Sequence, residues 1–274
     1  MKIKLFTMVK DEIDIVEDWI LYHGSLFGFN NLYIIDNFST DGTYQILKKY
    51  QKNKDIFVVR EENYLNKGLY IKHLMKDRFK DDYDIAYPLD IDEFIVYYDK
   101  INKKIDPNKI LEYFSILPDN VSVFKTNYII SLISNNTGYN NSIRESEFGI
   151  INKYNNLAKS FFNNKLWNGK LDHGNHYQTN NYFMTDLYLI HYHERNYDQI
   201  FKKTKNNLIG LGYKIDINYL KEKLDKNKNC IGNHHITRMI DILNNNYKLN
   251  KFTFNNQKGI ISLEPIKNYL ESIK

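Results

Sequence analysis

The sequence predicts an α/β fold in which a doubly wound, mostly parallel β-sheet is flanked by helices and followed by a C-terminal helical extension. Three observations predict it. Short apolar runs alternate with segments of helical periodicity in the first half of the chain. Two of these runs end in acidic residues, as strands that open on a ligand crevice do. After about residue 196, apolar residues recur at spacings of three to four.

The first half of the chain supplies the alternation of strands and helices. A helix is indicated over 11–27 because Val16, Ile20 and Phe27 recur at near-helical spacing. Strands that alternate with short helices are typical of βαβ units, whose strands pair in parallel. Strands are expected at 2–9, 32–36, 56–60 and 84–90, and further helices at 42–52 and 68–79.

The second half of the chain is more varied. Asp106-Pro107 predicts the start of a helix that runs to Phe114, since proline is favoured in the first helical turn. Strands are indicated over 121–130 and 186–190, and the Asn-rich span 134–156 predicts a surface loop. Four later helices are expected at 197–208, 218–224, 234–243 and 264–273.

Composition sets looser bounds on the protein. The 274 residues are 42% hydrophobic and 26% charged, which is enough apolar surface for a folded core. The single cysteine, Cys230, excludes an intramolecular disulfide and fits a reducing compartment. A net charge of +5 would attract an anionic ligand, but the lysines are spread along the chain rather than clustered. We therefore expect no nucleic-acid partner.

The cellular location is predicted from hydropathy. No stretch reaches the ~18 apolar residues needed to span a bilayer, and residues 1–10 are typical of a first strand rather than of a signal segment. We expect a cytoplasmic protein, in a bacterial cell or in a virus-infected host cell. A peripheral contact with a membrane stays open.

Two acidic strand ends predict the functional site. Asp90 and Asp92 follow the apolar run 85–89 and alternate, so both side chains share one face of an extended segment. Paired carboxylates suit Mn²⁺ or Mg²⁺, which can neutralise the phosphates of a nucleotide. Asp36 ends the run 32–35 and is expected at the same rim, where it would accept hydrogen bonds from a base or ribose. A solvated turn at 90–93 is the simpler alternative, and the flanking apolar runs argue against it.

Several segments, taken in order, resemble GT-A glycosyltransferases of the family 2-like and family 92-like (DUF23) groups. Two points depart from the family pattern: Lys10-Asp11-Glu12 stands where relatives often show Arg/Lys-Asn-Glu, and 131–156 has no clear counterpart. The segments that carry the resemblance are Thr7–Glu12, Trp19–His23 with Phe27-Gly28, Tyr33–Thr43, Leu89–Phe94, Ala158–Phe161 with Gly174–His176, and Ile190–Arg195 followed by Phe201–Lys203.

The resemblance implies a metal-dependent, inverting transfer of a hexose from a nucleoside diphosphate sugar, with a UDP-sugar favoured. The acceptor would be a hydroxyl of a glycan, lipid or protein. It also implies a GT-A catalytic domain over 1–195, with a donor-binding half at about 1–98 and an acceptor-facing half at about 99–195. Residues 196–274 would form the helical extension, which would cover the sheet, select the acceptor or form a homodimer surface.

Candidate residues for this reaction fall into four groups. Asp172 is the leading candidate for the general base because it lies in the loop 167–176, and Glu145 and Glu147 are the alternatives. Metal ligands would be Asp90, Asp92 and His191, a late histidine being a recurring GT-A ligand; His193 alternates with His191, and a buried structural histidine is the other interpretation. Donor-binding residues would be Thr7, Val9, Lys10, Glu12, Asp36, Asn37, Ser39, Asp41, Lys67, Asp90, Ile91 and Lys202. Acceptor- or sugar-binding residues would be Glu93, Lys159, Trp167, His173 and His176.

Plainer roles stay open for some of these residues. Glu93 could brace the acidic strand, Lys159 could be surface charge, and Ser39 and Asp41 could serve only the turn and the helix cap. Lys202 and Lys203 could lie on a solvated helix face, and His234-His235 is predicted to be the first turn of a tail helix. Two other function classes remain: a non-catalytic sugar- or nucleotide-binding module, and a sugar-1-phosphate nucleotidyltransferase, which would be expected to show a Gly-rich loop near the amino terminus.

Overall fold

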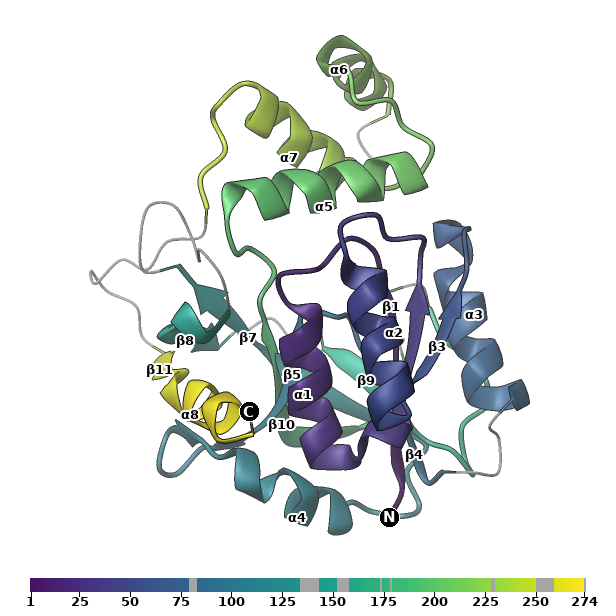
Figure 1. The fold of residues 1–274 in the computed structure, drawn as a ribbon, viewed down its shortest axis with the longest axis vertical. Helices are drawn as coiled ribbons and strands as arrows, with labels where there is room; N and C mark the ends of the chain where they lie inside the picture. The colour runs from purple at the N-terminus through teal and green to yellow at the C-terminus, as the bar shows by residue number, and fades with distance from the viewer. Residues whose placement is uncertain are drawn as a thin grey trace.

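The computed structural model describes residues 1–78, 83–133, 143–151, 158–172, 174–177, 179–227, 230–249 and 259–273. Within these ranges, strands form one mixed sheet with helices on both faces (Figure 1). The α/β class and the C-terminal helices are therefore confirmed. The strands are β1 (Ile3–Val9), β2 (Leu32–Asp36), β3 (Phe57–Arg60), β4 (Ile85–Pro88), β5 (Glu93–Asp99), β6 (Lys104–Ile105), β7 (Val123–Leu132), β8 (Phe148–Ile151), β9 (Lys159–Asn163), β10 (Phe183–His191) and β11 (Ile260–Ser262). The helices are α1 (Val16–Phe27), α2 (Thr43–Lys54), α3 (Lys67–His73), α4 (Ile110–Ser115), α5 (Tyr197–Gly210), α6 (Ile217–Lys226), α7 (Asn233–Leu243) and α8 (Glu264–Ser272).

Parallel pairing is concentrated in the first four strands. The sheet order is β3-β2-β1-β4-β9-β7-β10-β5-β6, and β1 pairs in parallel with both β2 and β4. Val9 at the end of β1 lies opposite Asp36 at the end of β2, and Phe6 lies opposite Pro88. Beyond β4 the sheet is mixed, because β9 runs antiparallel to β4 and β7 while β10 is parallel to β7 and antiparallel to β5. The carboxyl ends of β1, β2 and β4 therefore meet at one edge.

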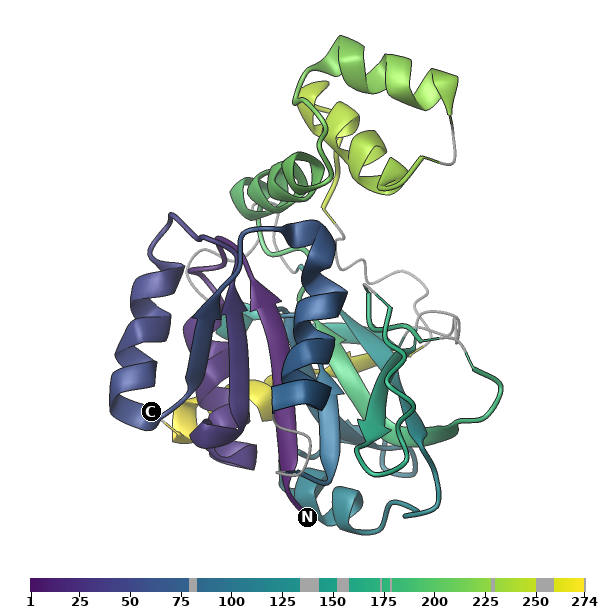
Figure 2. The same cartoon turned by 90° about the vertical axis from the view of Figure 1, so that its right-hand side faces the viewer.

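The alternation of side chains along β1 explains why helices cover both faces. Leu5 and Val9 face the larger core, which includes Trp19 of α1. Phe6 and Met8 face the smaller core under α3, where Ile71 and Met75 are packed. A strand that is buried on both faces needs apolar residues at successive positions, as β1 has. Figure 2 shows α1 and α2 on one side of the parallel strands and α3 on the other.

Helix α1 is fixed to the sheet by polar contacts as well as by packing. The Trp19 indole donates to the Glu93 carbonyl at 3.1 Å, and the Tyr22 hydroxyl donates to the Ile95 carbonyl at 2.7 Å. Both acceptors belong to β5, the strand that follows the acid pair. Burial of these two large side chains therefore also orients the segment that carries Asp90 and Asp92.

His23 of α1 is a fully buried, neutral histidine. Its Nδ1 lies 3.1 Å from the Trp19 carbonyl, and the Ile95 amide lies 3.3 Å from its Nε2. The neutral tautomer with hydrogen on Nδ1 satisfies both contacts, because it donates to the carbonyl and accepts from the amide. Burial lowers the pKa of His23 to about 3. A proton on Nε2 would point at the Ile95 amide hydrogen, so two hydrogen-bond donors would face each other inside the core.

His23 should make stability depend on pH. The unfolded chain binds this proton below about pH 6.5, whereas the folded chain binds it only near pH 3. Acidification between these values therefore favours unfolding, by about 1.4 kcal/mol per pH unit. In urea titrations, His23→Gln should lower stability at neutral pH, and its deficit relative to the natural chain should shrink by about 2 kcal/mol at about pH 5. His73→Gln, which changes an exposed histidine, is the matched control. An equal His23→Gln deficit at both pH values would contradict this interpretation.

The span 134–156 contains more structure than the predicted loop. Residues 143–151 hold a short 3₁₀ turn, Ile143–Glu145, and strand β8, while 134–142 and 152–157 lie outside the described residues. Strand β8 pairs with β7 and with β11. The prediction of a loop over 143–151 is therefore wrong, because Gly149 and the surrounding short apolar run gain their pairing from strands that lie far away in sequence.

The C-terminal segment has two parts. Helices α5, α6 and α7 share a small core of Leu208, Leu220, Ile236 and Met239, and lie over the carboxyl edge of the sheet (Figures 1 and 2). Strand β11 and helix α8 then return to the main core, which contains Ile261, Ile266 and Leu270. At the surface, the Tyr269 and Ser25 hydroxyls are 3.1 Å apart. None of the helices in the described ranges is long and apolar enough to cross a bilayer.

Candidate active site

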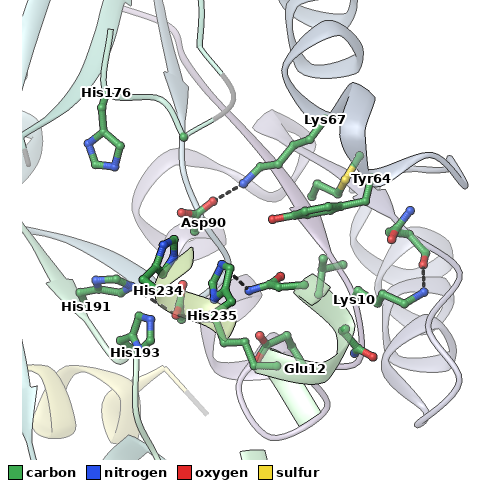
Figure 3. A pocket seen from close by; sticks show the side chains of 18 residues that line it. Lys10, Glu12, Tyr64, Lys67, Asp90, His176, His191, His193, His234 and His235 are labelled. Carbon is green, nitrogen blue, oxygen red and sulfur yellow. Dashed lines mark hydrogen bonds and ion pairs between the residues drawn. The ribbon is translucent and has the colours of Figure 1, made fainter. Parts of the chain in front are cut away.

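A cavity of about 380 Å³ lies at the carboxyl ends of β1, β2 and β4, beneath α5 and α7 (Figure 3). Its volume falls within the ~300–1,000 Å³ typical of small-molecule sites. It is lined by Met8, Val9, Lys10, Glu12, Asn37, Tyr64, Lys67, Asp90, Asp92, Gly174, His176, His191, His193, Lys203, Asn206, Asn207, His234 and His235. The acidic strand end and segments far away in sequence therefore open on one space.

The turn after β4 presents the two acids. The Glu93 amide donates to the Asp90 carbonyl at 3.1 Å, and the Asp90 amide donates to Glu93 Oε2 at 2.8 Å. Glu93 itself is fully buried and accepts a 2.6 Å hydrogen bond from the Tyr128 hydroxyl. Glu93 thus braces the turn, and Asp90 and Asp92 are left facing the cavity.

Asp90 is held between two lysines from separate elements. Lys67 of α3 contacts Oδ1, and Lys159 of β9 lies 2.7 Å from Oδ2. Lys159 is buried and also reaches Glu93 Oε1 at 3.3 Å. Burial by itself would raise the pKa of Asp90, but the two ammonium groups outweigh it and hold that pKa below its ordinary value. Asp90 is therefore an ionised carboxylate with one lysine ammonium group at each oxygen.

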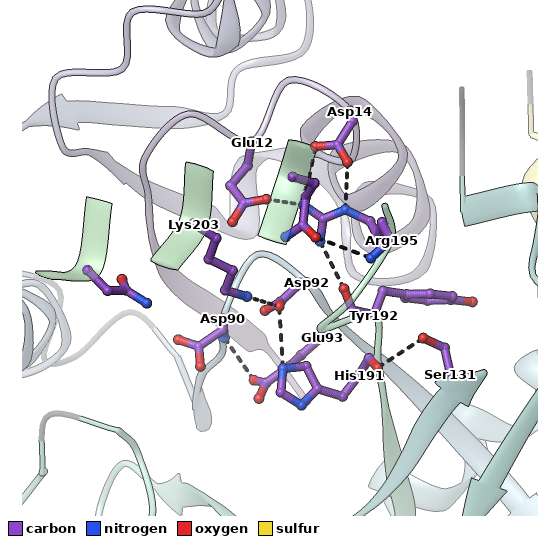
Figure 4. Close-up of polar contacts among 12 residues, drawn as sticks. Glu12, Asp14, Asp90, Asp92, Glu93, Ser131, His191, Tyr192, Arg195 and Lys203 are labelled. Carbon is purple, nitrogen blue, oxygen red and sulfur yellow. Dashed lines mark hydrogen bonds and ion pairs between the residues drawn. The ribbon is translucent and has the colours of Figure 1, made fainter. Parts of the chain in front are cut away.

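Asp92 has a different set of partners (Figure 4). His191 Nε2 lies 3.3 Å from Asp92 Oδ2, and the ammonium of Lys203 contacts the same oxygen. The Tyr192 amide donates to the Asp92 carbonyl at 2.9 Å, which ties the end of β10 to the acid pair. Burial raises the pKa of Asp92, and Lys203 and His191 together lower it further than burial raises it.

A buried arginine holds the wall of the cavity beside α1. Arg195 contacts Glu12 through Nη2, lies 2.6 Å from Asp14 Oδ2 through Nε, and donates to the Tyr192 carbonyl at 2.9 Å. Burial raises the pKa of Glu12 even though Arg195 opposes the shift. Arg195 therefore joins the segment after β1 to the segment after β10. Sequence reasoning assigned it no role, although it lies inside a segment that carries the family resemblance.

Five histidines line the cavity, and three of them, His176, His191 and His193, were singled out from the sequence. His191 ends β10, His193 lies two residues beyond it, and His176 faces them from the loop after β9. His234 and His235 are in the first turn of α7, as expected, but they also line the cavity. Burial, His234 and Arg238 lower the pKa of His235 to about 3, so this imidazole is neutral. Only the docking of α7 over the sheet edge brings these two side chains to the site.

The opposite end of the cavity is formed by β1 and β2. The Lys10 ammonium donates to the Asn37 carbonyl at 2.6 Å. The Asn37 amide group donates to the Glu61 and Glu62 carbonyls, both at 2.7 Å. Val9, Lys10, Glu12 and Asn37, which were expected to bind the donor, therefore all line the same cavity as Asp90.

The remaining donor-binding candidates lie next to this end without lining it. Asp36 is fully buried, accepts from Arg60 Nε at 2.8 Å and from the Ser39 amide at 3.2 Å. Lys202 is paired with Asp41 at 2.7 Å. Thr7 and Ile91 are buried within the fold, and the Ser39 hydroxyl accepts from the Asp11 amide. The neighbouring Lys203, not Lys202, lines the cavity.

Most of the acceptor-side candidates also lie outside the lining. Trp167 is buried in the smaller core, and its indole donates to the Lys170 carbonyl. Asp172 accepts from the His176 amide at 2.7 Å. Glu145 and Glu147 lie beside β8, where Glu147 is exposed. His173 falls outside the described residues. Lys159 reaches the site through Asp90, and His176 lines the cavity directly.

Comparison with protein-family models and with curated proteins finds no match. Solved structures give distant similarities. S. aureus TarS is 13% identical over 90% of this chain and 43% of that chain, with a TM-score of 0.38. Glucosyl-3-phosphoglycerate synthase from Mycobacterium tuberculosis, in complex with Mn²⁺, UDP and glucosyl-3-phosphoglycerate, is 17% identical over 46% of this chain and 44% of that chain, with a TM-score of 0.32.

A third similarity is to the mannosyltransferase PcManGT from Pyrobaculum calidifontis in complex with GDP-Man and Mn²⁺. It is 8% identical over 88% of this chain and 69% of that chain, with a TM-score of 0.43. The chain thus spans less than half the length of TarS and of the synthase.

Proposed function

We propose that this chain is a metal-dependent, inverting glycosyltransferase of the GT-A type. It would move a hexose from a nucleoside diphosphate sugar, preferably a UDP-sugar, to a hydroxyl of a glycan, lipid or protein. The observation that carries this proposal is the convergence of Asp92, His191 and Lys203 in one cavity with Lys10 and Asn37. One cavity would then offer a charged group to the phosphates and a polar end to the nucleoside.

The donor would lie along the cavity from β1 toward β10. Val9, Lys10 and Asn37 form the end that would take the nucleoside, at the rim where open α/β sheets bind their ligands. The diphosphate would then lie by Lys67, which is buried, and Lys203, which is half-buried; both ammonium groups already contact carboxylates. Burial strengthens their attraction for phosphate, because less water screens it. The sugar would extend toward His176 and His191.

We propose Asp92 and His191 as ligands of the divalent cation; in the part of the chain that the structure describes, no group of three or more His, Cys, Asp and Glu side chains is placed to hold a metal ion. Asp92 Oδ2 and His191 Nε2 are 3.3 Å apart, and a carboxylate oxygen with an imidazole nitrogen is a donor set that suits Mn²⁺. Both Asp90 oxygens contact lysines, and Asp92 Oδ2 contacts Lys203, so a cation at Asp92 would have to displace the Lys203 ammonium from that oxygen. A cation held by Asp92 and His191 would neutralise negative charge on the leaving diphosphate. Asp90 would instead orient Lys67 and Lys159 around it.

Nucleotide release tests this proposal. The chain would be incubated with a panel of UDP- and GDP-sugars and Mn²⁺, without an acceptor, and free nucleotide would be measured. We expect slow release from at least one donor and its loss in EDTA, because water can replace the acceptor hydroxyl. Glu112→Gln, an exposed change on α4 at the far end of the sheet, should release nucleotide at the natural rate.

The same assay separates the other function classes. A non-catalytic binding module would bind UDP in calorimetry and release none from the sugar donor. A sugar-1-phosphate nucleotidyltransferase would leave the UDP-sugar intact and would form pyrophosphate from UTP and a sugar-1-phosphate. Either result would contradict the proposal.

A further inference from the structure

An inverting transfer needs a group that removes the acceptor proton. The candidates for this general base that were chosen from the sequence lie outside the cavity lining. The base must lie within hydrogen-bond reach of the acceptor hydroxyl, directly or through one water. Asp172, Glu145 and Glu147 do not line the cavity. Asp172 is instead bound to the His176 amide at 2.7 Å, so it shapes the loop that carries His176.

The carboxylates that do line the cavity are poorly suited to accept this proton. Asp90 and Asp92 both contact lysines. These ammonium groups, with an imidazole beside Asp92, lower the pKa of each carboxyl by more than burial raises it. A carboxylate that already contacts ammonium groups would have to give up an ion pair to take the acceptor proton. Glu12 has a raised pKa, but its carboxylate contacts the buried Arg195, and it lies across the cavity from His176 (Figure 3).

His176 has the position and the protonation state that the step requires. It lines the cavity on the side away from Lys10, beyond Asp90 (Figure 3). Its Nδ1 lies 3.4 Å from the Ala158 carbonyl. A ring that donates from Nδ1 carries its lone pair on Nε2. Burial, followed by Lys159, lowers the pKa of His176, which keeps the imidazole neutral at physiological pH.

The loop around His176 is fixed to the sheet. The Ser160 amide of β9 donates to the Asn175 carbonyl at 2.9 Å, and the Asp172 carboxylate holds the next amide along. Strand β9 also carries Lys159, which contacts Asp90. The imidazole and the acid pair are therefore positioned by the same strand, which limits how far their separation can vary.

We propose that His176 is the general base of the transfer, an assignment that rests on the proposed function. The acceptor oxygen would form a bond to the anomeric carbon while the acceptor proton passes to His176 Nε2. The bond between the anomeric carbon and the diphosphate oxygen would break, and its electron pair would leave with the diphosphate. Burial and the Lys159 ammonium oppose the imidazolium that forms, and the charges of Glu93 and Asp90 partly offset them.

Two substitutions remove the basic nitrogen in different ways. His176→Asn keeps an amide that can donate to the Ala158 carbonyl, and His176→Gln places an amide near the position of Nε2. With the UDP- and GDP-sugar panel and Mn²⁺, we expect both variants to release nucleotide to water at least ~100-fold more slowly than the natural chain. UDP affinity and the melting temperature should stay unchanged. His73→Asn, a change to an exposed histidine on α3, is the matched control.

Azide distinguishes a lost base from a damaged donor site. Azide attacks without giving up a proton, so it should restore nucleotide release in both variants and form a glycosyl azide. Full release by the variants without azide would overturn the assignment, as would a loss that azide does not restore. If Glu12→Gln, rather than the His176 variants, released nucleotide slowly and recovered with azide, Glu12 would be the general base. If the natural chain releases no nucleotide from any donor, the proposed function itself fails.

Discussion

Asp92→Asn should reduce nucleotide release from a sugar donor by roughly 100- to 1,000-fold, the scale seen when one charge-stabilising group is removed from an active site. Asp92 is almost fully buried and contacts both His191 and Lys203. Asparagine keeps the shape of the side chain but removes the charge that would hold a cation. The measurement is release from the donor panel over a range of Mn²⁺ concentrations.

The same change also leaves Lys203 without its carboxylate, and that effect must be separated from catalysis. Removing one member of a buried ion pair typically costs ~3–5 kcal/mol of stability. Asp92→Asn combined with Lys203→Met removes both charges, so it should recover much of the lost stability and none of the activity. Natural rates in Asp92→Asn, at every Mn²⁺ concentration, would refute a role for this acid in donor binding.

Arg195→Met should be the most destabilising single change at the site, costing ~3–5 kcal/mol of unfolding free energy. The guanidinium is buried and contacts Glu12, Asp14 and the Tyr192 carbonyl. Methionine would leave two carboxylates and a carbonyl without their donor in a place with little water. Thermal unfolding should show a fall in melting temperature of roughly 5–9 °C.

Lys49→Met is a matched test of that reasoning. Lys49 also pairs with a glutamate, Glu17, at 3.2 Å, but 62% of the lysine side chain is exposed. Water and salt screen such a pair, so its loss should change stability by less than ~1 kcal/mol. Equal effects of Lys49→Met and Arg195→Met would show that burial of the Arg195 network does not matter.

The predicted helices and strands agree best with the structure where the residues that indicate them are close together in sequence. The helices at 197–208 and 234–243 and the strand at 32–36 match α5, α7 and β2 to within two residues. Periodicity over a few turns is enough to indicate such elements. Strands β9 and β11 went unpredicted because each is short and is stabilised by partners distant in sequence. Helix α1 begins at Val16 rather than at residue 11, because the φ angle of Asp11 is 54°, in the left-handed region where a right-handed helix cannot run.

Lys202 and Lys203 show that the local sequence pattern also does not identify every residue of the site. The two residues are adjacent, and successive positions on a helix point about 100° apart. Lys202 reaches Asp41, whereas Lys203 reaches Asp92. The basic segment was visible in the sequence, but its helical pattern did not show which lysine would face the cavity. That depends on how α5 rests on the sheet edge.

The α/β class and the acid pair at the end of an apolar strand could be predicted from the amino-acid sequence, because both depend on neighbours only a few residues apart. What surrounds those acids could not be predicted, because it depends on how distant segments pack together. Lys67, Lys159 and Lys203 come from three separate elements, and the histidines come from three more segments. Charges interact through space, and the cost of burying them forces pairings that no local pattern in the chain records.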